Sequence, residues 1–364
     1  MVIGCMNNES FVIHGGSKAV RPKAVIESHI PYIPEELAQY FDIVRLAPDE
    51  ITADAVSNAD ALIVRTRTRC DKALLDNSKC RFVATATIGT DHLDLPWLAA
   101  RNIEVASAPG CNAPAVAQYV LASLLSLFPE GLGGKTLGVV GAGNVGSIII
   151  RWAQQLGMQV LVNDPPRQAM EQSEDYVSLD TIIEDADIIT FHTPHTVEGP
   201  FATHHLADRK FFASLQRKPV IVNSARGPIT ETAALIEALD NGLVSAAVID
   251  CWEGEPTISR RLLQRAAVAT PHIAGYSLNG KIRATMATVN AMCRHFDIPY
   301  RMKSDIPSGA VETVTPQAIL QSYNPMNDST ELKNCLELSQ EEAVNRFELL
   351  RNKYPLRAEV VSSI

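Results

Sequence analysis

The sequence predicts an α/β protein built from two doubly wound parallel sheets, with a small α-containing segment at its C-terminal end. Short apolar runs that fit buried strands alternate with helical segments along most of the chain, which is typical of parallel sheets covered on both faces. A glycine-rich turn near the middle begins a second round of this alternation, and 364 residues are enough for two or three domains. These observations predict Rossmann-like or flavodoxin-like domains.

The first half of the chain contains five expected strands. Residues 1–22 have no clear pattern, and we expect them to be disordered or to form an extended lead outside the folded unit. A helix with Leu37, Tyr40 and Phe41 facing inward should follow the first strand. The expected strands are 23–26, 43–46, 61–64, 82–86 and 103–105.

The second half of the chain repeats the alternation of strands and helices, which stops beyond His295. A helix that opens near Pro114 is apolar on most sides, so we expect it to be buried between the domains. Beyond His295, prolines interrupt the chain, and an acidic helix with Phe347 on its apolar face should end before Pro355. This tail is too short to fold alone and should pack on its own chain or on a second subunit. The expected strands are 137–140, 158–162, 188–191, 220–223, 246–249 and 267–269.

Composition and charge exclude several classes of partner. Hydrophobic residues make up 46% of the chain, and the net charge of −9 disfavours nucleic acid and anionic membrane surfaces. We find no apolar run of membrane-spanning length and no signal-peptide pattern. The seven cysteines show no Cys-x-x-Cys spacing, so we expect reduced thiols and a cytoplasmic protein. The nine histidines form no metal-site pattern, and we expect no metal.

The glycine-rich turn predicts a nicotinamide cofactor. An apolar strand ends in Gly-x-Gly-x-x-Gly, in which Gly141 permits the tight turn, Gly143 admits a pyrophosphate and Gly146 lets helix and strand pack together. The helix N-terminus that follows favours an anion. Asp164 stands at the end of the next strand, where a carboxylate would bond the ribose hydroxyls and favour NAD over NADP. The alternative is a ligand-free turn in which Asp164 only shapes the backbone.

Three successive strand ends carry residues suited to oxidising a 2-hydroxy acid. Arg226 can bind a carboxylate through two hydrogen bonds, and His272 can accept the hydroxyl proton near neutral pH. Glu255 would orient the imidazole and stabilise its charged form. Taken singly, these residues could instead be a surface cation, a loop histidine and a carboxylate at a helix start.

A second cluster points to a phosphate group on the substrate. Arg65, Arg67 and Arg69 alternate at the end of a strand in the first domain, and they would share one side if that strand continued. With the hydroxyls of Thr66 and Thr87 they would form a site for a doubly charged phosphate. The alternative is a solvated edge strand protected by its cations.

The order of these motifs resembles the D-isomer-specific 2-hydroxyacid dehydrogenases over residues 23–296, and faintly again near residues 347–354. Stretches that carry the resemblance include Ala84-Thr85-Ala86-Thr87-Ile88-Gly89-Thr90-Asp91-His92, Trp252-Glu253-Gly254-Glu255-Pro256 and His272-Ile273-Ala274-Gly275-Tyr276. The resemblance implies Arg226, Glu255 and His272 as catalytic residues, and Thr66, Thr87 and Tyr276 as substrate contacts beside Arg65 and Arg67. It implies NAD contacts from Gly141, Gly143, Asn144, Val145, Gly146, Asp164, Thr193, Ser224, Ala225, Arg226, Asp250 and Gly275.

Within that family, the chain is most similar to the branch that oxidises 4-phospho-D-erythronate with NAD during pyridoxal 5′-phosphate biosynthesis. The implied domains are a substrate-binding domain (23–112 with 275–298), an NAD-binding Rossmann domain (113–274) and a C-terminal dimerisation segment (299–364), with a homodimer as the assembly. The open alternatives are another D-2-hydroxyacid dehydrogenase, of glycerate or phosphoglycerate type, and an NADH-sensing regulatory protein on the same scaffold.

Overall fold

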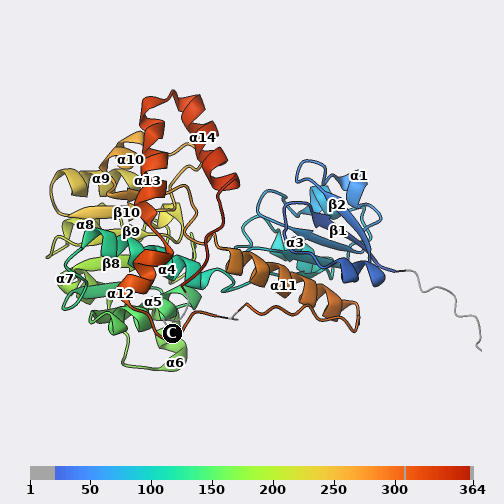
Figure 1. Ribbon diagram of the computed structural model, residues 1–364, viewed down its shortest axis with the longest axis horizontal. Coiled ribbons are helices and arrows are strands. Elements are labelled where there is room, and N and C mark those ends of the chain that lie inside the picture. Colours follow the sequence, from blue (N-terminus) through green and yellow to red (C-terminus); the bar gives the residue numbers. More distant parts are fainter. Residues whose placement is uncertain (1–20, 307–308, 361–364) are drawn as a thin grey trace, which may run out of the picture.

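The computed structural model describes residues 21–306 and 309–360 and confirms the predicted fold class. Figure 1 shows two lobes, one built on a five-stranded parallel sheet and the other on a six-stranded parallel sheet. The lead expected over residues 1–22 lies outside the described residues as far as residue 20.

The first sheet has the order β2-β1-β3-β4-β5, which is the flavodoxin-like order. Its alternating side chains are buried on both faces. Ile26 and Ile63 belong to the core shared with α11 (Leu278–His295), and Val25 and Leu62 pack against the helices on the opposite face. The strands are β1 (Lys23–Glu27), β2 (Asp42–Leu46), β3 (Ala61–Val64), β4 (Phe82–Thr85) and β5 (Glu104–Ala106).

The helices of this lobe are short. The helix expected around Leu37 is a five-residue 3-10 turn, because Pro34 precedes it and β2 begins at Asp42. Leu37 and Phe41 are buried as expected, whereas Tyr40 is only partly buried. The elements are η1 (Glu35–Gln39), α1 (Ala53–Val56), α2 (Lys72–Leu75) and α3 (Leu95–Ala100).

The second sheet has the order β11-β10-β9-β8-β6-β7. All its strands are parallel, but β7 is added on one side of β6 and β8 on the other, so the strand order reverses between β6 and β8. In doubly wound sheets, ligands bind beyond the carboxyl ends of the strands at such a reversal. The predicted strands are all present, with small differences at their ends: β6 (Thr136–Val140), β7 (Gln159–Asn163), β8 (Ile188–Phe191), β9 (Val220–Asn223), β10 (Ala246–Ile249) and β11 (Val268–Ala269).

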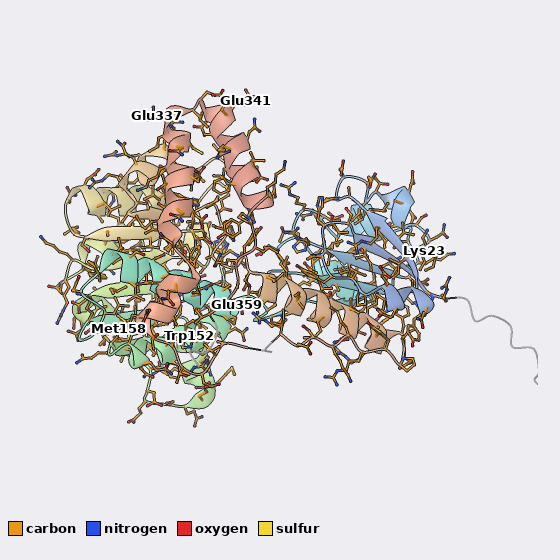
Figure 2. All side chains as sticks on the ribbon, in the orientation of Figure 1. Lys23, Trp152, Met158, Glu337, Glu341 and Glu359 are labelled. Carbon is orange, nitrogen blue, oxygen red and sulfur yellow. The ribbon has the colours of Figure 1, made fainter. Side chains whose placement is uncertain are left out.

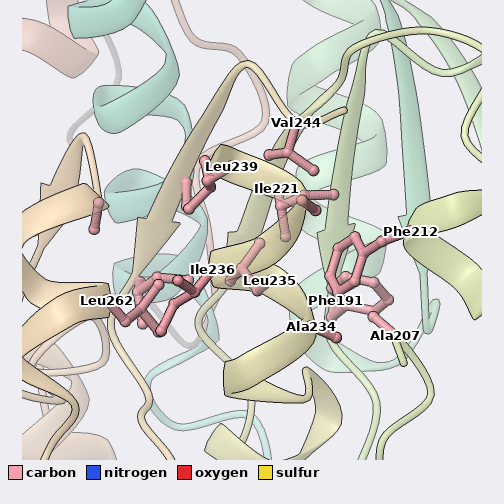
Figure 3. Close-up of a cluster of buried hydrophobic side chains, with 14 of the residues drawn as sticks. Phe191, Ala207, Phe212, Ile221, Ala234, Leu235, Ile236, Leu239, Val244 and Leu262 are labelled. Carbon is pink, nitrogen blue, oxygen red and sulfur yellow. The ribbon is translucent and has the colours of Figure 1, made fainter. Parts of the chain in front are cut away.

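Helices cover both faces of the second sheet. Figure 3 shows one of its cores, in which Phe191 and Ile221 from the strands meet Leu235 from α9 and Leu262 from α10. The opposite face packs against α4 and α5. The helices of this lobe are α4 (Ala113–Leu127), α5 (Asn144–Gln155), α6 (Pro165–Glu171), α7 (Leu179–Asp185), α8 (Arg209–Ala213), η2 (Gly227–Ile229), α9 (Thr232–Asp240) and α10 (Arg260–Arg265).

Helix α4 is buried along almost its whole length, but its partners differ from those expected. It packs against α5 on one side and against the C-terminal helices α12 and α13 on the other, rather than filling a gap between the two sheets. The sequence could not show this arrangement, because the covering helices come from residues about two hundred positions later.

The C-terminal segment folds back onto the second lobe. Ile319, Leu332 and Phe347 are buried in the two cores of that lobe. Figure 2 labels Glu337 and Glu341 at the outer tip of this segment. The prolines that interrupt the sequence start two of its helices, since Pro fits the first helical position. The elements are α12 (Pro316–Ser322), α13 (Pro325–Lys333), η3 (Asn334–Glu337) and α14 (Gln340–Asn352).

The last described residues form a strap across the crossing between the lobes. Arg357 pairs with Ser277 in a parallel bridge just before α11, and its guanidinium donates to the carbonyls of Ala115, Ile273 and Tyr276 at 3.1 Å each. Glu359, labelled between the lobes in Figure 2, accepts from the Ser277 hydroxyl at 2.7 Å. The strap therefore binds the start of α4 to the segment that leads into α11.

Candidate active site

The glycine-rich loop between β6 and α5 has one crowded side and one open side. Gly141 has a φ of 97°, and a Cβ added to Gly146 would lie 2.0 Å from the Gly141 carbonyl oxygen. Both positions therefore require glycine. By contrast, a Cβ at Gly143 would meet no described atom within 4 Å. The open space at Gly143, beside the first turn of α5, suits the close approach of a pyrophosphate.

Asp164 shapes the backbone beside the glycine-rich loop. Its Oδ1 caps α6 by accepting from the Arg167 amide at 3.1 Å, and its Oδ2 accepts from the Ala142 amide at 2.8 Å. The carboxylate thus lies against the glycine-rich loop. The Arg167 guanidinium is engaged by Glu171, at 2.7 and 2.9 Å, and by the Ala142 carbonyl.

Two buried hydroxyls beside the carboxyl ends of β8 and β9 lack partners among the residues that the structure describes. Thr193 Oγ1 and Ser224 Oγ are buried and form no hydrogen bond within the part of the chain that the structure describes. A buried hydroxyl without a partner is costly, so each is suited to a bound polar ligand. With the space at Gly143, these atoms fit an NAD molecule that lies along the strand ends.

The loops that carry Arg226, Glu255 and His272 begin at neighbouring strand ends. Asn223 at the end of β9 pairs with Ile249 of β10, which pairs with Ala269 of β11. The three loops therefore leave the sheet side by side, as the sequence predicted for parallel strands. The Cys251 thiol, at the start of the loop after β10, donates to the Ala225 carbonyl of the neighbouring loop at 3.5 Å.

His272 and Glu255 form a hydrogen-bonded pair. His272 Nδ1 lies 2.8 Å from Glu255 Oε2, while Glu255 Oε1 accepts from the Trp252 amide at 2.8 Å. His272 has a φ of 57°, a left-handed conformation held by a 2.9 Å bond from its amide to the Asp250 carbonyl. Because Nδ1 faces the carboxylate, Nε2 is left to exchange a proton with a substrate.

The electrostatics of the pair favour a charged imidazole. Burial lowers the pKa of His272, but Cys251 and the Glu255 carboxylate outweigh it and hold that pKa well above its ordinary value. Burial raises the pKa of Glu255, yet the charge and hydrogen bond of His272 bring it below the ordinary value. The pair therefore stabilises the proton on His272 once the ring has accepted it.

Asp250 is buried beneath this pair and shapes the loop that carries His272. Its Oδ1 accepts from the Thr270 hydroxyl at 2.7 Å and the Ile273 amide at 2.8 Å, and Oδ2 accepts from the Ala274 amide at 3.0 Å. Burial raises the pKa of this carboxyl group. Gly275 follows on the same loop, where a Cβ would lie 2.0 Å from the Asn112 side-chain nitrogen.

Arg226 reaches from the second lobe to the first. Its guanidinium lies 3.5 Å from Asp91 Oδ2, and a Cβ on Gly89 would lie 2.5 Å from its Nη2. Asn223 fixes the Arg226 backbone by donating to its carbonyl at 2.9 Å. The side chain is half-exposed at the junction of the lobes, where it can bind a substrate carboxylate.

The arginines after β3 do not form one row. The strand ends at Val64, so the alternation that would have placed them on one side stops there. Arg67 pairs with Glu348 of α14, and Arg69 bonds Asp71 at 2.9 Å. The Nε of Arg65 is buried and has no hydrogen-bond partner in the described residues. Of the three, Arg65 is the one whose guanidinium has a buried nitrogen with no partner in the described residues.

The other predicted substrate contacts, Thr66, Thr87 and Tyr276, differ in their surroundings. The Thr87 hydroxyl bonds Thr85 Oγ1 at 2.7 Å and the Gly89 carbonyl at 3.2 Å, close to Arg226. Thr66 is exposed. Tyr276 stacks edge-on against Tyr354, with ring centroids 6.1 Å apart.

Two cations near Tyr276 were missed from the sequence. Lys281 lies with its ammonium 4.5 Å from the Tyr276 ring centroid. Arg351 of α14 lies 3.7 Å from Glu255 Oε2, and its charge is one of those that lower the pKa of Tyr276. A lysine and an arginine in ordinary helices carry no local signal of such a position. The faint resemblance near residues 347–354 was the one hint that the sequence gave for Arg351.

Metal sites and membrane-spanning helices are both absent from the described residues. Among the described residues, no group of three or more histidine, cysteine or carboxylate side chains is arranged to hold a metal ion. Nor does the described part of the chain contain a helix long and apolar enough to cross a membrane.

The fold and this set of strand-end residues define a D-isomer-specific 2-hydroxyacid dehydrogenase. Residues 122–274 match the family described as "D-isomer specific 2-hydroxyacid dehydrogenase, NAD binding domain". Holo D-mandelate dehydrogenase from Rhodotorula graminis has a TM-score of 0.65 and 24% identity, covering 75% of this chain and 94% of its own. NAD⁺-bound 3-phosphoglycerate dehydrogenase from Entamoeba histolytica has a TM-score of 0.65 and 22% identity, covering 78% and 99%. These neighbours share the fold.

Curated relatives place the chain more narrowly. Erythronate-4-phosphate dehydrogenase from Bacteroides thetaiotaomicron is 47% identical over 345 residues, which cover 93% of this chain and 97% of that protein. The enzyme of the same name from Azotobacter vinelandii is 39% identical over 354 residues, with 93% of each chain covered. The chain therefore belongs to the erythronate-4-phosphate dehydrogenase family, and the resemblance seen in the sequence is confirmed.

Proposed function

We propose that the protein oxidises 4-phospho-D-erythronate to 3-hydroxy-2-oxo-4-phosphonooxybutanoate with NAD, as a step of pyridoxal 5′-phosphate biosynthesis. The observation that carries this proposal is the 2.8 Å pair of His272 and Glu255, set at the strand end beside the loop of Arg226. The names of the curated relatives support the choice of substrate.

The three residues divide the chemistry between them. Arg226 binds the substrate carboxylate and fixes the carbon that bears the hydroxyl group. His272 accepts the hydroxyl proton at Nε2, while Glu255 holds the ring at Nδ1 and stabilises its positive charge. NAD, when bound, takes the hydride that leaves the same carbon. In the reverse direction, His272 returns the proton to the carbonyl oxygen.

The remaining predicted residues bind the two small molecules. Gly143 and the first turn of α5 would hold the pyrophosphate, Asp164 the ribose, and the hydroxyls of Thr193 and Ser224 the rest of the cofactor. We assign substrate binding to residues 23–112 with 275–298, and NAD binding to residues 113–274. Arg65, Thr66, Arg67, Thr87 and Tyr276 would contact the substrate.

We also propose a homodimer that forms through residues 299–364 and works in the cytoplasm. Four large apolar side chains in this segment are 36–43% exposed, which supports a protein partner there: Leu320, Met326, Leu349 and Leu356. The six described cysteines are free thiols, in keeping with a reducing compartment. Sedimentation equilibrium tests the assembly, and a monomer at micromolar concentration would contradict it.

The test of the proposed function is the formation of NADH, followed by absorbance, from purified protein and one of three acids. We expect turnover with 4-phospho-D-erythronate and much less with 3-phosphoglycerate or lactate. The variant His272→Ala should be slower by about 10²–10⁴, the usual contribution of a general base. Preference for 3-phosphoglycerate would favour the phosphoglycerate alternative. Tight NADH binding without turnover of any acid would favour the regulatory one.

A further inference from the structure

Three cations from distant parts of the chain meet around Tyr276, at the edge of the active site. Arg65 follows β3 of the first sheet, Lys281 lies in the first turn of α11, and Arg351 lies in the last turn of α14. All three act on the Tyr276 hydroxyl: burial raises its pKa, but the charges of Lys281, Arg351 and Arg65 outweigh burial and lower it.

Lys281 and Arg65 lack anionic partners in residues 21–306 and 309–360. The Lys281 ammonium lies over the Tyr276 ring at 4.5 Å and forms no ion pair there. The Arg65 Nε is buried without a hydrogen bond, although its backbone amide is anchored to Glu27 at 2.8 Å. Burial and the nearby Arg65 charge lower the pKa of Lys281 to about 8. Two uncompensated cations so close together are costly unless an anion joins them.

Arg351 connects this cluster to the catalytic pair. It lies 3.7 Å from Glu255, the carboxylate that holds His272, and its charge is one of those that lower the pKa of Tyr276. Glu348, one turn earlier on α14, pairs with Arg67 in the first lobe. Helix α14 therefore contacts loops from both lobes, and Figure 1 shows it extending from the second lobe toward the first.

We propose that Lys281 and Arg351 join Arg65 as the groups that bind the terminal phosphate of the substrate. A phosphate monoester carries close to two negative charges at neutral pH and three acceptor oxygens, which suits three cations around one point. The proposal rests on the proposed function, and it extends the binding site to residues that the sequence did not indicate. It also makes the C-terminal helix a part of the active site.

Inorganic phosphate is the probe that tests this site without turnover. Its binding to the NAD-saturated protein is measured by ³¹P line broadening at constant ionic strength. Lys281→Gln and Arg351→Gln should each weaken phosphate binding by roughly tenfold or more, the effect of a hydrogen bond to a charged group. Lys281→Arg keeps the charge and should restore most of the binding. Arg346→Gln is the matched control, because Arg346 lies on the same helix but pairs with Glu331 at 2.8 Å.

The pH dependence separates Lys281 from its neighbours. The charged groups that face it are Arg65, Arg351, Tyr276 and Cys111. Phosphate binding to the wild-type protein should weaken as the pH rises through about 8, where Lys281 loses its proton. Lys281→Arg should remove this loss. An unchanged affinity in Lys281→Gln and Arg351→Gln, or an equal loss in Arg346→Gln, would overturn the proposal.

Kinetics then separates phosphate binding from an indirect effect on Glu255. Arg351→Gln should lower kcat/KM for 4-phospho-D-erythronate by roughly 10- to 100-fold and change that for D-erythronate little. Equal losses on the two acids would show that Arg351 acts only through Glu255, which contradicts its assignment. If the wild-type protein oxidises neither acid, the proposed function fails, and the phosphate titration still decides whether this site binds the anion.

Discussion

Replacing Glu255 with glutamine tests the coupling within the proposed catalytic pair. Glu255 lies 2.8 Å from His272 Nδ1, and the imidazole ring is 30% exposed. Two unit charges about 4 Å apart attract by about 4 kcal/mol at an effective dielectric constant near 20. Water that reaches the ring screens this attraction, and if about half of it remains, the pair is stabilised by roughly 2 kcal/mol. That energy corresponds to about thirtyfold in the equilibrium for protonating His272.

The pH profile of the oxidation rate should shift in one direction in Glu255→Gln. His272 must be neutral to accept the hydroxyl proton, so the oxidation rate rises as the pH rises through its pKa. Because Glu255 raises that pKa, the rising limb of the profile in Glu255→Gln should move to lower pH. The maximal kcat/KM should fall by about thirtyfold, because the amide no longer stabilises the charged ring.

The assay is the initial rate of NADH formation from pH 5 to pH 10. Glu253→Gln is the matched control, since Glu253 lies on the same loop but bonds His205 at 2.6 Å. A profile that stays in place or moves to higher pH in Glu255→Gln would refute the coupling.

Four further substitutions test the cofactor loop and the C-terminal strap. Asp164→Ser removes the carboxylate proposed to face the ribose, so the ratio of kcat/KM for NADP to that for NAD should rise, and an unchanged ratio would contradict the assignment. Gly146→Ala should destabilise the protein by about 1–3 kcal/mol in denaturant unfolding, because its Cβ would lie 2.0 Å from the Gly141 carbonyl oxygen. Gly143→Ala, which meets no described atom, should leave stability nearly unchanged and weaken NAD binding; comparable stability in the two variants would refute this contrast. Arg357→Met removes the hydrogen bonds that the charged guanidinium donates to the carbonyls of Ala115, Ile273 and Tyr276 and should cost at least about 3 kcal/mol, whereas a loss below about 0.5 kcal/mol would show that the strap is not needed.

Local patterns predicted the sheets and the strand-end residues well, for a physical reason. A parallel strand is short, apolar and buried on both faces, so β8 and β9 stand out in the sequence without any knowledge of their neighbours. The residues that follow such strands must lie at one edge of the sheet. The pairing of His272 with Glu255 follows from that edge once the strand order is known.

Long-range packing set the features that the sequence did not predict. No local pattern indicates that Arg351 lies near Tyr276, because that placement depends on how α14 packs across the molecule. Lys281 follows Tyr276 by five residues, but an exposed-looking lysine in a helix gives no sign of its role. The partners of α4 were misplaced for the same reason. The row of arginines considered in the sequence does not form, because β3 ends at Val64 and the chain turns before the alternation can continue.

The most direct measurement of the central claim is the crystal structure of the protein with NADH and a non-reacting 4-phosphorylated 2-hydroxy acid analogue. We expect the ligand carboxylate to bind Arg226 and its 2-oxygen to lie within hydrogen-bond distance of His272 Nε2. We expect its phosphate to lie between Arg65, Lys281 and Arg351. A ligand bound with its 2-oxygen away from His272, or with its phosphate outside that group of cations, would contradict the account.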